Sequence, residues 1–182
     1  MNITIISGSP RKASVTKRLG FFLETQLKEN KDLNVNHIVI SDLELPFIQN
    51  VWTDIKDVPD SFKEIYQKLN DSDGFIFVTP EYNGGYSSAM KNLLDYFPKS
   101  TYAKKAIGIV TASPGAMGGM RAAMQMQQMI LGFWGIPSPH MLIVPSIDKK
   151  FDENNNLVDE SFSSAISSFL TEYLWLFHKL RD

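Results

Sequence analysis

The sequence predicts a single α/β domain in which helices cover both faces of a parallel sheet. Two observations lead to this prediction. Five short apolar runs alternate along the chain with five segments whose apolar residues recur at helical spacing. In addition, residues 1–182 contain no internal repeat, linker or low-complexity tract, so we expect one domain. Parallel strands joined by right-handed helical crossovers satisfy this order of elements.

The predicted strands are short and rich in β-branched or aromatic residues. Residues 3–7 form a β-branched run that Gly8 and Pro10 end. Residues 75–78 are apolar without interruption, as expected for a central strand that is buried on both faces. The other three strands are expected at residues 35–40, 106–111 and 141–144.

The predicted helices follow the 3.6-residue period. Apolar residues at spacings of three and four follow Ser14 and indicate the first helix. Pro59 stands where a second helix can start, and Gly74 lies beyond its end. The remaining helices are expected at residues 86–97, 117–131 and 162–180. Each helix therefore offers one apolar face to the sheet.

The composition excludes several classes of function. The 18 basic and 20 acidic residues nearly balance, and a formal charge of −2 does not favour nucleic-acid binding. The chain has no cysteine, which excludes disulfides, thiol nucleophiles and thiolate metal sites. Its three histidines, His37, His140 and His178, share no metal-ligand spacing. We see no signal peptide or transmembrane run, so we expect a cytoplasmic protein without a metal or membrane partner.

Three loops are expected at the carboxyl ends of the strands, where parallel sheets bind ligands. They are the stretches richest in Gly, Pro, Ser and Asn. The first loop comprises residues 8–16, the second loop residues 79–85 and the third loop residues 112–119. The sequence therefore predicts a ligand site shared by these loops.

The first loop has the donors of an anion site. A helix N-terminus offers unpaired N–H groups, and Gly8 lets the backbone approach a ligand closely. Ser9, Ser14 and Thr16 add hydroxyl groups, and Arg11 adds a charged fork that matches a phosphate. The loop matches neither the dinucleotide nor the triphosphate fingerprint, which favours a terminal monophosphate. The alternative interpretation is an ordinary turn and helix cap, with Ser14 as the N-cap.

The second and third loops suit a flat heterocycle. Tyr82 can pack on a ring, and Asn83 can offer its amide to a ring nitrogen or carbonyl group. For Glu81 we favour the alternative that its carboxylate braces the loop. Ser113 and Gly115 of the third loop allow close approach from the other side.

Three blocks of residues together resemble a known family. They are Gly8-Ser9-Pro10-Arg11-Lys12-Ala13-Ser14, then Pro80-Glu81-Tyr82-Asn83 with Lys91-Asn92 and Asp95, then Ser113-Pro114-Gly115 with Gly118-Gly119. These blocks resemble the NAD(P)H-dependent FMN reductases, which include enzymes described as azoreductases, quinone reductases and chromate reductases. The chain departs from the family at Pro10, where Leu is usual, and at Ser87-Ser88, where Pro-Gly is common. The second departure concerns the substrate pocket more than FMN binding.

The resemblance implies a three-layer, flavodoxin-like, doubly wound sheet of five parallel strands in the order 2-1-3-4-5. It also implies FMN as the cofactor. By carry-over, the cofactor-binding residues are Ser9, Arg11, Ser14, Val15, Thr16, Pro80, Glu81, Tyr82, Asn83, Gly84, Ser113 and Gly115. Of these, Ser9, Arg11, Ser14 and Thr16 surround the phosphate. The isoalloxazine is bordered by Pro80, Glu81, Tyr82 and Asn83, and Ser113 and Gly115 close the far side.

The expected activity is that of an NAD(P)H-dependent flavin oxidoreductase. A flavin supplies its own redox chemistry, and the sequence shows no Ser/His/Asp set, so we expect no catalytic residue. The expected cycle is ping-pong, with a hydride passing from NADPH or NADH to N5 of FMN and on to a small acceptor. Quinones, azo compounds, flavins and metal oxyanions are the candidate acceptors. The alternatives are a flavodoxin-type electron carrier and a non-catalytic FMN-binding protein.

Oligomerisation is expected from a methionine-rich helix and from the resemblance. Five methionines, Met117, Met120, Met124, Met126 and Met129, cannot all face one side of a helix. Those that face outward with Trp134 are candidates for a subunit contact. The resemblance implies a homodimer or homotetramer with flavin sites close to the interface.

Overall fold

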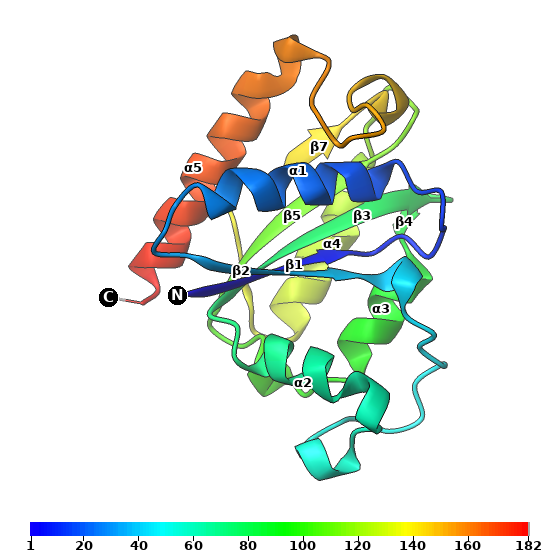
Figure 1. Cartoon of the computed structure of the whole chain (residues 1–182), viewed down its shortest axis with the longest axis vertical. Helices are drawn as coiled ribbons and strands as arrows, with labels where there is room; N and C mark the ends of the chain where they lie inside the picture. Colours follow the sequence, from blue (N-terminus) through cyan, green and yellow to red (C-terminus); the bar gives the residue numbers. More distant parts are fainter. Residues whose placement is uncertain (182) are drawn as a thin grey trace.

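The computed structural model describes residues 1–181 and has a central sheet between two layers of helices (Figure 1). The sheet order is β2-β1-β3-β5-β6, and its long strands pair in parallel. The strands on this path are β1 (Asn2–Ser7), β2 (Asn34–Val39), β3 (Gly74–Tyr82), β5 (Ala106–Ala112) and β6 (Ile136–Pro137). The predicted α/β class and the order of the five expected strands are confirmed.

The sheet has seven strands rather than five. The fifth predicted strand, at residues 141–144, corresponds to β7 (Leu142–Val144). The strand β6 was not predicted; an interruption separates it from β7, and the two pair with opposite ends of β5. Pro139 lies in the interruption, where a residue without an N–H group cannot donate to a ladder. The seventh strand, β4 (Gly85–Tyr86), pairs antiparallel with the end of β3.

Helices cover both faces of this sheet. They are α1 (Thr16–Lys28), α2 (Lys63–Asn70), α3 (Ser88–Asp95), α4 (Met120–Gly132) and α5 (Ser163–Lys179). Figure 1 shows α1 and α5 on one side, and α2, α3 and α4 on the other. The second helix begins later than Pro59 predicts, because a 3-10 turn precedes it. Within residues 1–181 no helix is both long and apolar enough to span a bilayer.

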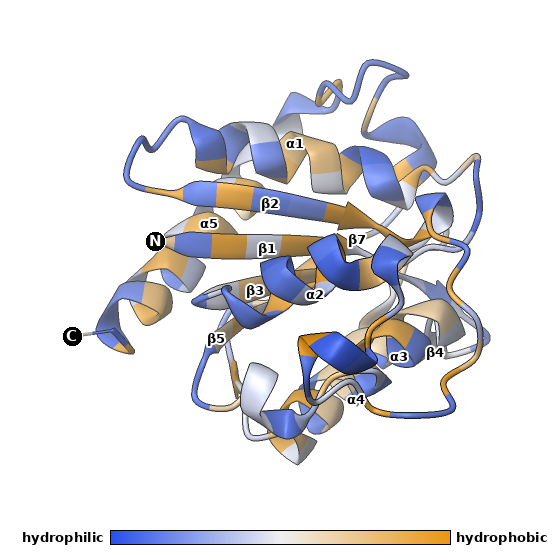
Figure 2. Cartoon of the chain, turned by 60° about the horizontal axis from the view of Figure 1, so that its bottom comes forward, coloured by the Kyte–Doolittle hydropathy of each residue, from blue (hydrophilic) through white to orange (hydrophobic). Residues whose placement is uncertain are grey.

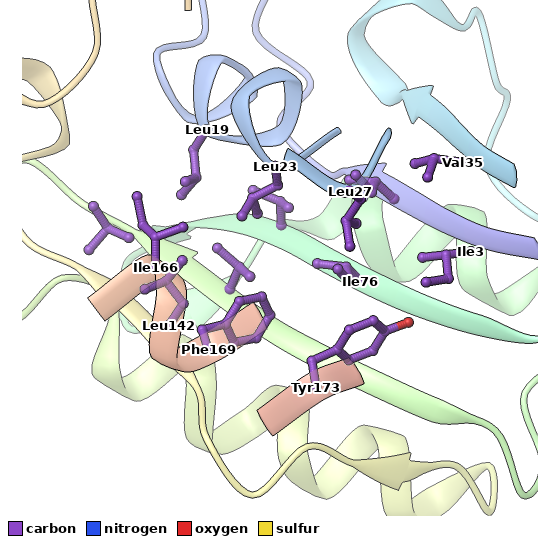
Figure 3. Close-up of a cluster of buried hydrophobic side chains, with 14 of the residues drawn as sticks. Ile3, Leu19, Leu23, Leu27, Val35, Ile76, Leu142, Ile166, Phe169 and Tyr173 are labelled. Atoms are coloured by element: carbon purple, nitrogen blue, oxygen red, sulfur yellow. The ribbon is translucent and has the colours of Figure 1, made fainter. Parts of the chain in front are cut away.

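Two hydrophobic cores result from the alternation of side chains along the strands. In β3, Ile76 and Val78 belong to the core beneath α1 and α5, whereas Phe75 and Phe77 belong to the opposite core. Figure 3 shows the leucines of α1 pointing toward β3; they share one core with Phe169 of α5. The central strand β1 is largely hydrophobic, whereas its edge neighbour β2 mixes hydrophilic and hydrophobic residues (Figure 2). This burial fixes which side of each strand faces which helix layer.

Strand register brings the three loops together. Ser7 at the end of β1 pairs with Val78, and Pro80 of β3 pairs with Ala112 at the end of β5. Because the strands are parallel, the loops that follow them leave from the same edge of the sheet. The predicted convergence of the first, second and third loops is therefore confirmed.

Candidate functional site

A cavity of about 600 Å³ lies where the loops meet, a size that suits a ligand of cofactor dimensions. Most of the residues predicted to bind the cofactor line it, namely Ser9, Arg11, Ser14, Val15, Thr16, Pro80, Glu81, Tyr82 and Asn83. The wall also includes Ala112 and Pro114 of the third loop. The remaining predicted residues, Gly84, Ser113 and Gly115, stand beside lining residues but do not line the cavity themselves. Their contact with a cofactor stays a prediction.

The N-terminus of α1 opens into this cavity without a cap from the protein. Val15 is the N-cap residue, and no side chain accepts a hydrogen bond there. The interpretation of Ser14 as an ordinary N-cap is therefore wrong. Ser14 and Thr16 are only 8% and 6% exposed, and neither hydroxyl group bonds to another residue within the described chain. Free N–H groups and hydroxyl groups therefore border the same cavity.

Arg11 and Tyr82 join the first loop to the second loop. The Arg11 guanidinium carbon lies 4.5 Å from the centroid of the Tyr82 ring, which is cation–π geometry. The Tyr82 hydroxyl lies 3.2 Å from Oγ of Ser9. Arg11 is exposed and forms no ion pair with any of residues 1–181. Its charge is therefore available to an anion in the cavity.

Glu81 braces the second loop against α4, as predicted by the interpretation that its carboxylate has a structural role. Its Oε2 accepts hydrogen bonds from the backbone N–H groups of Arg121 (3.0 Å) and Ala122 (3.1 Å). Gly119, the N-cap residue of α4, has a φ of 89° and no side chain to do this. A carboxylate is also favoured there by the positive end of the helix dipole. Glu81 thus caps a helix from a distant loop.

The second loop is a tight hairpin, which the sequence analysis missed. Tyr82 pairs with Gly85 across a two-residue turn of Asn83 and Gly84. Both turn residues have positive φ, 51° and 83°, which favours asparagine and glycine. An Asn-Gly pair between strand-forming residues is a strong hairpin signal and would have predicted β4. The hairpin extends β3 as far as the cavity.

The downstream motif residues hold neighbouring segments. Asn92 accepts a hydrogen bond from the N–H of Ile48 (2.9 Å) and donates one to the carbonyl oxygen of Pro46 (2.7 Å). Lys91 and Asp95 form an exposed (i, i+4) ion pair on α3. None of these residues lines the cavity, so they support the loops around it rather than a ligand.

Two lining residues, Ile147 and Asp148, lie outside the three predicted loops. They follow β7 in a 3-10 turn, and the N–H of Ile147 donates to the carbonyl oxygen of Ser113 over 3.2 Å. The strand order could have predicted them, because the loop after the fifth strand of a parallel sheet also leaves from the carboxyl edge. Asp148 adds a carboxylate to a wall that otherwise carries mainly donors.

Comparison with known proteins gives consistent matches. Residues 1–148 match the family described as NADPH-dependent FMN reductase. The chain is 30% identical to a probable NADPH:quinone oxidoreductase 2 of Oryza sativa subsp. japonica, over 93% of this chain and 85% of the rice protein. It is 26% identical to an NADPH azoreductase of a Bacillus species, over 81% of this chain and 78% of that protein.

A solved structure shares the fold. The flavoenzyme FerB, an NAD(P)H:(acceptor) oxidoreductase from Paracoccus denitrificans, superposes with a TM-score of 0.81 at 22% identity, over 98% of this chain and 97% of FerB. The donors around the cavity also fit the phosphate of a flavin mononucleotide, since an uncapped helix N-terminus and an arginine face the same space. The chain belongs to the NADPH-dependent FMN reductase family and is an NAD(P)H-dependent flavin oxidoreductase with FMN as its cofactor.

Proposed function

We propose that this oxidoreductase binds the phosphate of FMN at the N-terminus of α1 and transfers reducing equivalents from NAD(P)H to a quinone. The observation that carries the proposal is the absence of a side-chain cap on α1 at a point where Arg11 lines the same cavity. Backbone N–H groups, the Ser14 and Thr16 hydroxyl groups and the Arg11 guanidinium supply the donors. Such a cluster compensates a dianionic phosphate.

The second loop borders the ring of the cofactor in this proposal. Tyr82 and Pro80 provide apolar surface, and the Asn83-Gly84 turn provides backbone N–H groups near the ring edge. Bound FMN supplies the hydride chemistry, so the protein contributes position, hydrogen bonds and exclusion of water. The turn's N–H groups stabilise negative charge on the reduced ring. No side chain of this chain is assigned the role of an essential acid or base.

A quinone is the proposed acceptor, because the rice relative and other relatives are named as quinone reductases. Donor and acceptor use the same open face in turn, which is a ping-pong sequence. Azo compounds, flavins and metal oxyanions are secondary acceptors of the same site. The test is stopped-flow mixing of the FMN-loaded protein with NADPH and with NADH, followed by a benzoquinone. Bleaching by one donor and recovery with the quinone are expected, and absence of bleaching with both donors overturns the proposal.

Replacing Arg11 tests the position of the phosphate. Arg11→Ala should weaken FMN binding by about 10- to 100-fold, because a charge-assisted hydrogen bond is lost. Lys12→Ala is the matched control, since Lys12 is the neighbouring exposed cation and does not line the cavity. Flavin-fluorescence titration of the apoprotein measures both affinities. Equal affinity of Arg11→Ala and wild type would place the phosphate elsewhere.

A homodimer through α4 and its flanking loops is the proposed minimum assembly. Exposed apolar side chains gather there, namely Met117 (68% exposed), Met120 (37%), Met124 (39%), Leu131 (57%) and Trp134 (67%). Met126 is buried and Met129 packs against the core, so only part of the methionine set is available. Light scattering should give a dimer or a dimer of dimers, and Met124→Glu should shift it toward monomer. The proposed location of the assembly is the cytoplasm, which cell fractionation tests.

A further inference from the structure

A chain of hydrogen bonds runs beneath the first loop. Oγ of Ser7 lies 2.8 Å from Nε2 of His37, and Nδ1 of His37 lies 2.8 Å from Oε2 of Glu24. The other carboxylate oxygen of Glu24 pairs with Nζ of Lys28 at 2.6 Å. The sequence analysis found no Ser/His/acid set, because these residues belong to β1, β2 and α1. Only the packing of α1 over the two strands brings them together.

A neutral histidine has one donor and one acceptor nitrogen, which fixes the direction of each hydrogen bond from Ser7 to Glu24. His37 donates its Nδ1–H to the Glu24 carboxylate and accepts the Ser7 hydroxyl proton at Nε2. The same order activates the serine of hydrolases. Here Ser7 is 1% exposed, and Gly20 of α1 packs against its hydroxyl group so closely that a Cβ atom would collide with it. No substrate reaches Ser7, so its hydroxyl group does not act as a nucleophile. The hydrogen bonds of Ser7, His37 and Glu24 instead have a structural role.

The hydrogen-bond chain joins the strand before the first loop to the helix after it. Ser7 is the last residue of β1, directly before Gly8, and Glu24 belongs to the helix with which the loop ends. Gly8 is held from the opposite side, since its N–H donates to Val78 (2.7 Å) and its carbonyl oxygen accepts from Ser87 Oγ. The end of β1 is therefore held on one side by contacts with α1 and β2. On the other side it is held by contacts with β3 and with the start of α3.

We propose that Ser7, His37 and Glu24 are positioning residues that set the geometry of the first loop, so that FMN affinity depends on the intact chain. The proposal rests on the proposed phosphate site at α1. It predicts a loss specific to the phosphate, because the ring is bordered by the second loop. It also predicts a dependence on the protonation of His37, since an imidazolium has no acceptor for the Ser7 proton.

The charged groups that face His37 come from two elements. Glu24 and Lys28 approach it from α1, and Asp42 acts on it from the turn after β2. Burial lowers the pKa of His37, and Glu24 offsets only part of this effect. Burial acts to raise the pKa of Glu24, but hydrogen bonds from Lys28 and His37 outweigh it and hold that pKa below its usual value. Both directions fit a neutral histidine beside a carboxylate at neutral pH.

The experiment compares two buried hydroxyl groups of the same strand. Ser7→Ala breaks the hydrogen-bond chain from Ser7 through His37 to Glu24. By contrast, Thr4→Val removes a buried hydroxyl group three residues earlier in β1, which bonds Ser72 (2.6 Å). The apoprotein is titrated with FMN and with riboflavin, which lacks the phosphate. Ser7→Ala should bind FMN about three- to tenfold more weakly with riboflavin affinity unchanged, as for the loss of one hydrogen bond. Thr4→Val should leave both affinities unchanged.

A pH profile gives a second readout. The phosphate of FMN itself titrates at a pKa of about 6 and also makes FMN affinity depend on pH. The wild type is therefore compared with His37→Gln, in which His37 no longer titrates and only the phosphate does. Below about pH 6.5, wild-type affinity for FMN should fall more steeply than the affinity of His37→Gln, because burial holds the pKa of His37 under that value. This profile keeps the proposal testable if Ser7→Ala does not fold. Glu24→Gln weakens the acceptor of the His37 Nδ1–H and should also bind FMN more weakly. Its matched control is Glu64→Gln, because Glu64 also pairs with a lysine four residues on but has no histidine partner within residues 1–181.

The outcomes separate this proposal from the proposed function. If Arg11→Ala weakens FMN binding but Ser7→Ala behaves like Thr4→Val and the two pH profiles coincide, the positioning role is overturned and the phosphate site stands. Equal losses for FMN and riboflavin in Ser7→Ala also overturn it, since they indicate a general structural defect. If Arg11→Ala has no effect, the phosphate site and the positioning role are both overturned.

Discussion

Helices α1 and α4 begin at the same edge of the sheet, but only one of them is capped by the protein. At α4, the carboxylate of Glu81 accepts from the N–H groups of Arg121 and Ala122. At α1, no side chain accepts from the first turn, and Arg11 adds positive charge to the same cavity. Every helix start carries unpaired N–H groups that need an acceptor. A helix start that the chain leaves open beside a cavity is therefore a place for an external anion.

The comparison also separates two uses of charged residues in the motif blocks. Glu81 lies in one of the three motif blocks, yet its carboxylate holds two parts of the protein together. Arg11 lies on the first loop, its guanidinium lies over an aromatic ring, and it has no carboxylate partner within residues 1–181. In the proposed phosphate site, the motif blocks therefore combine a ligand residue, Arg11, with a bracing residue, Glu81, and their partners within the protein distinguish the two roles.

The largest expected effect comes from giving α1 the cap that α4 has. Ser14→Asp introduces a carboxylate at the open helix start, where it repels a phosphate and occupies its N–H donors. FMN affinity should fall about 100-fold, while the apoprotein should be as stable as wild type or about 0.5–1 kcal/mol more stable. Flavin titration and urea denaturation measure the two quantities. Riboflavin affinity serves as the control, and unchanged FMN affinity would contradict the comparison.

The reverse change removes the cap of α4. Glu81→Ala should lower the free energy of unfolding of the apoprotein by about 1–2 kcal/mol, because two N–H groups lose their acceptor. Glu81→Gln keeps an acceptor oxygen and should lose less. Glu153→Ala is the control, since Glu153 is an exposed loop residue. Urea denaturation measures all three, and a Glu81→Ala variant as stable as its control would show that the brace contributes nothing.

The two helices differ further in having a buried histidine only beneath α1. The fold holds the pKa of His37 below its usual 6.5, so the unfolded chain takes up a proton first as the pH falls. The free energy of unfolding should therefore be greatest above that pH and decrease below it, by up to about 1.4 kcal/mol per pH unit. His37→Gln should flatten this slope above about pH 5, where carboxyl groups titrate little. A steeper slope in the variant would reverse the expected sign.

The smallest expected effect compares the glycines of the two helices. Gly132 is the last residue of α4, and a Cβ atom there would meet nothing within 4 Å. Gly132→Ala should stabilise the protein by about 0.5 kcal/mol through the lower entropy of the unfolded chain. Gly20→Ala in α1 should destabilise it, because the new Cβ atom collides with the Ser7 hydroxyl group. Thermal unfolding of both variants checks the opposite signs.

Much of the fold was predictable because it depends on local patterns. The apolar run at residues 75–78 is buried on both faces of the sheet, as the lack of alternation predicts. The misses have local causes as well. The Asn83-Gly84 turn, a local hairpin signal, produces β4, and the short strand β6 lies in a proline-containing stretch before the last predicted strand. Tyr86 therefore belongs to β4 and not to the third helix.

The sequence by itself determined the order of elements, the loops that meet at one edge and most of the residues that line the cavity. These features follow from periodicity and from short motifs, which are properties of neighbouring residues. The tertiary structure decided which helix start is capped, which residues form the chain below the first loop, and that Asp148 reaches the cavity. Glu81 and Arg121, or Ser7 and His37, lie far apart in the sequence. Their contacts depend on how strands and crossovers pack, which no local pattern contains.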